Sequence, residues 1–82
     1  MSERSTSAQV RNPLLSLPAA GRLADLSPDA RSALRSLLLD IRQDAQARAE
    51  KSWRSHKAPM AAYWKAVAVY AGHIARLLRP TK

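Results

Sequence analysis

Cations and aromatic side chains alternate over residues 51–65, the stretch with the clearest capacity for binding chemistry. It contains four cations, no acidic residue and three of the four aromatic residues of the chain. Aromatic rings stack on nucleobases and cations neutralise phosphates, so this combination suits single-stranded nucleic acid. A second interpretation fits as well, because Trp53 and Trp64 flank a predicted interhelical turn, where large side chains close the corner of a hairpin. We expect both tryptophans to pack in the core and the cations to point outward.

The net charge of +8 lies almost wholly at one end of the chain. Residues 1–50 hold seven arginines and six acids, whereas residues 51–82 hold seven cations and no acid. A one-sided distribution indicates an acidic partner, which is a nucleic acid, an acidic protein surface or an anionic membrane. The alternative is a solvated basic face without a partner. The candidate partner-binding or nucleic-acid-binding residues are Lys51, Arg54, Lys57, Lys65, Arg76 and Arg79.

The residue types give little support to catalysis or to a cofactor. The chain has no cysteine, and its two histidines stand 17 positions apart with no neighbouring carboxylate. It has no glycine-rich phosphate loop and no zinc-ligand spacing. Asp40 and Asp44 are one helical turn apart, but without a third acidic ligand we interpret them as solvated surface charge. We predict a non-enzymatic protein with no cofactor and no metal.

The elements that position these residues are predicted to be helices, because sixteen alanines and eleven leucines dominate the composition. Residues 1–12 are polar and are predicted to form a disordered tail before a single helical domain over 13–82. Within that domain we expect short helical turns over 13–26, a helix over 28–55 and a helix over 60–79. Ser27 and Pro28 suit a helix start, and Pro59 opens the last helix.

Apolar residues spaced three and four apart predict which faces of the two long helices form the core. In helix 28–55 they are Ala30, Leu34, Leu37, Leu38, Ile41, Ala45 and Ala49. In helix 60–79 they are Met60, Tyr63, Trp64, Val67, Tyr70, Ala71, Ile74, Leu77 and Leu78. The prediction is an all-α helical hairpin of two long helices, with the short N-terminal segment laying leucines on its core. Two ion pairs are expected one turn apart, Asp44 with Arg48 and Glu50 with Arg54.

A second face of helix 60–79 carries small or weakly polar residues where a free-standing helix would carry charge. A glycine within a helix costs about 1 kcal/mol relative to alanine, so its presence indicates close approach by another helix. This face can pack on the N-terminal segment, on a second copy or on a target. We favour a homodimer, because one short hairpin has few core residues. The candidate interface residues are Ala62, Ala66, Val69, Gly72 and His73.

Two other uses of the last helix are less well supported. As the reading helix of a helix-turn-helix it would offer arginine alone, since residues 60–79 contain no Asn, Gln, Ser or Thr. As a membrane-surface helix it would need the apolar face that the hairpin core uses. The sequence has neither a secretory signal nor the run of about 20 apolar residues that spans a bilayer. A cytoplasmic location is therefore expected.

The C-terminal part of the chain resembles small proteins of bacterial prophages and other mobile elements. The resemblance lies in the Trp-Arg, Lys-Ala-Pro-Met and Tyr-Trp-Lys-Ala elements of the stretch KSWRSHKAPMAAYWKAVAVYAGHIARLLR. It implies a short, non-enzymatic protein that blocks a host machine, as anti-CRISPR inhibitors do. Our leading hypothesis is an inhibitor or modulator of a nucleic-acid-processing complex that acts by steric and electrostatic docking. The alternatives are a DNA-binding transcriptional regulator of a mobile element and a structural or assembly protein.

Overall fold

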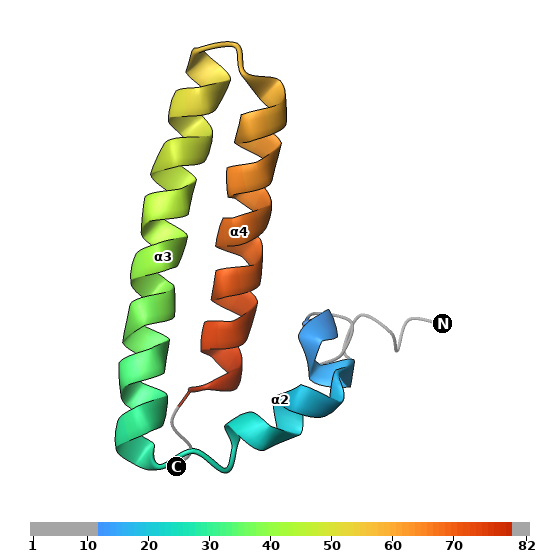
Figure 1. Cartoon of the computed structure of the whole chain (residues 1–82), viewed down its shortest axis with the longest axis vertical. Helices are drawn as coiled ribbons and strands as arrows, with labels where there is room; N and C mark the ends of the chain where they lie inside the picture. Colours follow the sequence, from blue (N-terminus) through green and yellow to red (C-terminus); the bar gives the residue numbers. More distant parts are fainter. Residues whose placement is uncertain (1–11, 80–82) are drawn as a thin grey trace, which may run out of the picture.

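The computed structural model describes residues 12–79, and these form a helical hairpin with a short N-terminal helical segment (Figure 1). In chain order the elements are the 3-10 helix η2 (Pro13–Ser16), α2 (Pro18–Leu23), α3 (Pro28–Arg54) and α4 (Ala58–Leu77). The two long helices α3 and α4 run antiparallel, and the N-terminal segment lies beside the lower half of α4, away from α3 (Figure 1). The predicted all-α hairpin is confirmed. The predicted tail lies outside the described residues, except for Asn12.

Local chemistry sets the ends of the long helices. The Ser27 hydroxyl accepts a hydrogen bond from the backbone N–H of Ala30 at 3.1 Å, as the predicted cap requires. At the other end of α3, the N–H of His56 donates to the carbonyl of Trp53 at 3.1 Å, and the N–H of Lys57 donates to that of Ser52 at 2.8 Å. His56 has a φ of 61°, the left-handed conformation that completes this type of helix end. The chain therefore reverses within three residues.

The two long helices pack through a seam of alanines. On α4 the buried residues are Ala61, Ala68, Ala71, Ala75 and Leu78. They recur at steps of seven, three and four, the spacing of a side that faces a neighbouring helix over its whole length. On α3 the buried residue is Ala45, and Leu38 and Ser52, seven residues to either side, are half-buried. Small side chains on both helices let the two backbones approach closely.

The core face predicted for the last helix was right for Ala71 and Leu78, which are buried, and wrong for the two tyrosines and Met60. Tyr63 and Tyr70 expose 56% and 58% of their surface, and Met60 is exposed as well. On α3 the same error holds for Leu37, which is 55% exposed, and for Ala30. Successive residues of a helix lie 100° apart around its axis. The contact with α3 contains Ala68 and not its neighbour Val67 at its centre, and this rotation places Tyr63 and Tyr70 to one side of the hairpin.

One hydrogen bond ties the N-terminal segment to α4. Asn12 is 4% exposed, and its Nδ2 donates to the carbonyl oxygen of His73 at 3.0 Å. Its Oδ1 accepts from the N–H of Leu14 at 3.3 Å, which confirms Asn12 as the predicted cap. The expectation that leucines of this segment pack on the core was only partly right, because Leu15 and Leu17 are exposed. The hydrogen bond of this buried amide therefore helps to position the segment on α4.

Ala75 is 1% exposed, so we expect that a larger side chain at this position does not fit between the helices. Ala75→Leu should lower the free energy of unfolding by about 1–3 kcal/mol, because overpacking forces two close helices apart. Ala66→Leu is the matched control, since Ala66 is exposed on the same helix. Urea denaturation of both variants checks this, and equal midpoints would contradict the alanine seam.

Candidate partner-binding face

Three arginines of α3 run along one edge of the alanine seam. Arg35 and Arg42 are two helical turns apart and so lie on the same side of the helix, with Arg31 one turn before them. The Nε atoms of Arg31 and Arg35 are buried and have no hydrogen-bond partner within residues 12–79. The Nη2 of Arg31 donates to the carbonyl oxygen of Arg79 at 3.1 Å, just beyond the end of α4. Arg31 and Arg35 are therefore half-buried, and the exposed Arg42 has its Cδ beside Gly72.

A groove of about 760 Å³ lies along this side of the hairpin, between α3 and α4. We call it the basic groove. Its floor consists mainly of small apolar side chains, which are Ala49, Ala58, Ala61, Ala62, Ala68, Val69 and Gly72. Its other lining residues are polar, charged or aromatic, namely Arg42, Gln46, Glu50, Trp53, Lys65, His73 and Arg76. Three cations therefore stand around an apolar floor, together with a single carboxylate.

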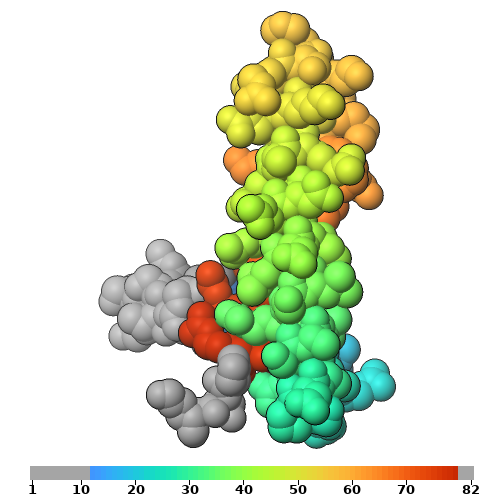
Figure 2. Space-filling model, turned by 90° about the vertical axis from the view of Figure 1, so that its left-hand side faces the viewer, coloured from blue at the N-terminus to red at the C-terminus, as the bar shows by residue number. Residues whose placement is uncertain are grey.

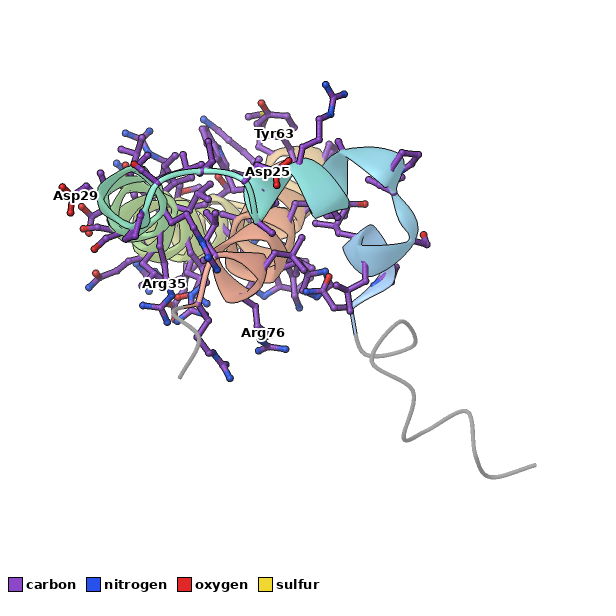
Figure 3. The ribbon with its side chains drawn as sticks, turned by 90° about the horizontal axis from the view of Figure 1, so that it is seen from below. Asp25, Asp29, Arg35, Tyr63 and Arg76 are labelled. Carbon is purple, nitrogen blue, oxygen red and sulfur yellow. The ribbon has the colours of Figure 1, made fainter. Side chains whose placement is uncertain are left out.

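The charged residues of the basic groove differ in their ion pairing. Within residues 12–79, Arg42, Lys65 and Arg76 take part in no salt bridge. The groove's carboxylate, Glu50, already pairs with Arg54 at 3.6 Å. A further depression of about 470 Å³ at the start of α3 is lined by Arg31 and Arg35, among others. Figure 3, seen from below, places Arg35 and Arg76 on one side of the hairpin.

The structure gathers only part of the predicted cation set. Lys65 and Arg76 line the basic groove, whereas Lys51, Arg54 and Lys57 lie exposed around the top of the hairpin and do not line it. Arg79 follows α4 and contributes the carbonyl that Arg31 binds. Both predicted ion pairs are confirmed, and the Asp44–Arg48 distance is 3.4 Å.

Sequence reasoning missed the arginines of α3 because the acids of the first 50 residues cancel their charge in a count along the chain. The spacing of these arginines could have identified them. Arg35 and Arg42 are seven residues apart, and both fall next to the apolar stripe of their helix. A cation in that position must lie at the edge of the helix pair, where it can meet the cations of α4.

The small-residue face of α4 largely coincides with the basic groove. Ala62, Val69, Gly72 and His73 line it, and Ala66 is exposed outside it. The glycine is explained by α3, because a Cβ added at Gly72 would stand 3.0 Å from the Cδ of Arg42. The close approach that the sequence indicated is thus made by an arginine side chain of the same hairpin.

The two tryptophans occupy different surroundings. Trp53 is 67% exposed and lines the basic groove near the turn, so the expectation that it packs in the core was wrong. Trp64 is half-buried, and its ring lies 5.2 Å below the guanidinium carbon of Arg48. It also contacts Tyr63 edge to face, with 5.0 Å between the ring centroids. Cation–π and aromatic contacts of this kind hold Trp64 on the hairpin, whereas Trp53 is largely exposed.

The opposite side of the hairpin is apolar. Figure 3 places Tyr63 across the hairpin from Arg35 and Arg76. The exposed large apolar residues of α3 and α4 that do not line the basic groove are Leu37, Ile41, Met60, Tyr63 and Tyr70. Figure 2 views α3 from outside and shows its upper half flanked only by α4. The hairpin therefore presents a basic side and an apolar side.

Within residues 12–79, no helix combines the length and the apolar character that crossing a membrane demands. The same residues contain no group of three or more His, Cys, Asp or Glu side chains placed to hold a metal ion.

Comparisons with known proteins give no match for this chain, whether against family models, curated proteins or solved structures. The physical features of the two sides therefore carry the functional interpretation.

The contact between Arg42 and Gly72 makes a double-mutant cycle informative. Gly72→Ala should stabilise the protein by about 1 kcal/mol in an Arg42→Ala background, because alanine is the better helix former. With Arg42 present the gain should be smaller, since the new methyl group meets its Cδ. Gly21→Ala is the control, because a Cβ there has nothing within 4 Å. Urea unfolding measures each free energy, and an equal gain at Gly72 in both backgrounds would show that the contact is absent.

Proposed function

We propose that this protein is a non-catalytic docking protein that inhibits or modulates a nucleic-acid-processing complex. Its basic groove would bind an anionic surface of that complex and exclude the normal partner by steric and electrostatic competition. The observation that carries the proposal is the convergence of Arg42, Lys65 and Arg76 on one groove without a salt bridge among residues 12–79. Cations held on a fixed apolar frame bind anions with little ordering cost.

The prophage resemblance supports the same proposal from a different direction. Short, non-enzymatic proteins of mobile elements often act by blocking a host machine, and the sequence offers no motif typical of a catalytic site. We place the chain in that anti-CRISPR-type class by role. A phage or mobile-element origin and a cytoplasmic location belong to the proposal.

Charge reversal in the groove tests the proposal against a control of equal net charge. The groove variant is Arg42→Glu, Lys65→Glu and Arg76→Glu, and the control is Arg22→Glu, Lys51→Glu and Lys57→Glu. Each set lowers the formal net charge from +8 to +2. On immobilised heparin, a dense polyanion, the groove variant should elute at clearly lower salt than the control, because only it loses the clustered cations. Elution of both variants at the same salt would refute a dedicated groove.

A mobility-shift titration with duplex DNA, at about 50 and 200 mM salt, separates the two binding classes. Tight, sequence-selective binding by the chain alone would replace the docking proposal with a DNA-binding transcriptional regulator. Heparin retention without a DNA shift would support an acidic protein surface.

We also propose a homodimer, formed through the apolar side of the hairpin. Two copies meeting through the small-residue face would bring Lys65 and Arg76 of each close to the same cations of the other, and like charges repel. The apolar side offers Leu37 and Tyr70, each more than half exposed.

Light scattering at high micromolar concentration should give the mass of a dimer. Leu37→Glu should give a monomer, because it buries a charge at the interface. Ala47→Glu is the control, since Ala47 is exposed elsewhere on α3 and should leave the dimer intact. A monomeric parent protein would overturn the proposal, and large oligomers would favour a structural or assembly role.

A further inference from the structure

The basic groove combines cations, which any polyanion can reach, with apolar side chains that a simple polyanion would leave uncovered. Its floor is built of Ala58, Ala61, Ala62, Ala68 and Val69, none of which offers a polar side-chain atom. Phosphates and sugars laid over such a floor would leave apolar surface uncovered and gain nothing from it. Around the axis of α4, Lys65 and Arg76 fall between the buried Ala68 and the outer Val69 and Ala62, and Arg42 of α3 lies over Gly72, so the cations are set among the apolar side chains. The complementary partner therefore carries apolar and acidic side chains together.

The dimensions of the groove suit a helix. Its lining residues Ala58 and Arg76 are 18 positions apart on α4, which is about 27 Å at 1.5 Å per residue. On α3 the lining residues run from Arg42 to Trp53, which is 11 positions or about 17 Å, so a third helix of about three turns can lie along both α3 and α4, as in a three-helix bundle. Because the floor carries only small side chains, the incoming helix must supply the large ones, at spacings of three and four residues.

Three other occupants fit poorly. A second copy would set Lys65 and Arg76 against the same cations, as argued for the dimer. The chain's own residues 1–11 contain Glu3, Arg4 and Arg11, so they are net basic, and their only large apolar residues are Met1 and Val10. Single-stranded nucleic acid needs a series of stacking rings, and Trp53 is the one aromatic residue that lines the groove.

We infer that the basic groove binds an acidic amphipathic helix of a partner protein. Leucine-sized side chains of that helix cover the alanine floor, and its carboxylates accept hydrogen bonds from Arg42, Lys65 and Arg76. Arginine pairs with carboxylates through two parallel hydrogen bonds, which fixes the register of such a helix. Trp53 lies at the end of the groove near the turn, where its ring closes over the helix terminus. The inference rests on the proposed docking function and names its partner.

The test uses a synthetic acidic peptide with leucines at helical spacings of three and four and glutamates elsewhere. A second peptide of the same composition has its leucines scattered around the helix. The reporter is the emission of Trp53 in a Trp64→Phe variant, which should shift to shorter wavelength as the ring is covered. The patterned peptide should bind and shift the emission, whereas the scattered peptide should bind at least about tenfold more weakly.

Two matched variants locate the binding. Ala62→Phe fills the floor of the groove and should weaken the patterned peptide by about tenfold or more, whereas Ala66→Phe, four residues away and outside the groove, should not. Circular dichroism establishes that both variants are folded. Equal affinities for the two variants, or for the two peptides, would overturn the inference.

The outcomes also separate this inference from the proposed function. If heparin retention depends on the groove cations but the patterned peptide does not bind, the inference fails and the docking proposal stands. If single-stranded DNA of equal charge binds more tightly than the patterned peptide, the occupant is nucleic acid and the inference is again overturned. If heparin retention does not depend on the groove cations, the docking proposal itself fails.

Discussion

Close packing of α3 against α4 through alanine is the constraint on which the rest of the molecule depends. With Ala45, Ala68 and Ala75 in the seam, Leu78 is the one large side chain within residues 12–79 that is fully buried. The other large side chains therefore lie on the two sides of the seam, and the two sides differ in residue type. Arginines and lysine collect along one edge, and leucine, isoleucine and tyrosine collect along the other. If leucines formed the seam, the large apolar residues would lie between the helices, and the helices would be farther apart. The hairpin would then have neither its basic groove nor its exposed apolar side chains.

The local features of the fold followed from the sequence because nearest neighbours determine them. The cap at Ser27, the break before Pro59 and the pairing of Asp44 with Arg48 each depend on residues within one helical turn. The orientation of α4 was not predictable in this way. Large apolar residues dominate any measure of hydrophobic periodicity, yet Tyr63 and Tyr70 are mostly exposed, and alanines, which carry little hydrophobic weight, form the contact. The orientation of α4 depends on how closely the two helix backbones can approach each other. The periodicity of a single helix does not contain this information.

The candidate site was half predictable for a related reason. Lys65 and Arg76 stood out because the end of the chain is free of acids, whereas Arg42 was hidden among the balanced charges of α3. What brings Arg42 to the others is Gly72, across which its side chain lies. The glycine was noticed as a sign of close approach, but the identity of the approaching group required the second helix in place. When two helices share a site in this way, its residues can be identified only once the pairing of the helices is known.

The seam and the basic groove also share residues, and this links stability to binding. Ala61 and Ala68 are buried between the helices and line the groove as well. Alanine buries little apolar surface, so the hairpin alone gains a modest hydrophobic stabilisation for its length. A helix laid in the groove would cover these residues from the open side and turn a two-helix contact into a three-helix core. Since it would bind the closed hairpin and not the unfolded chain, its binding would add directly to the stability of the fold. Under this proposal, the seam that holds the two helices together is also part of the surface that a partner helix would cover.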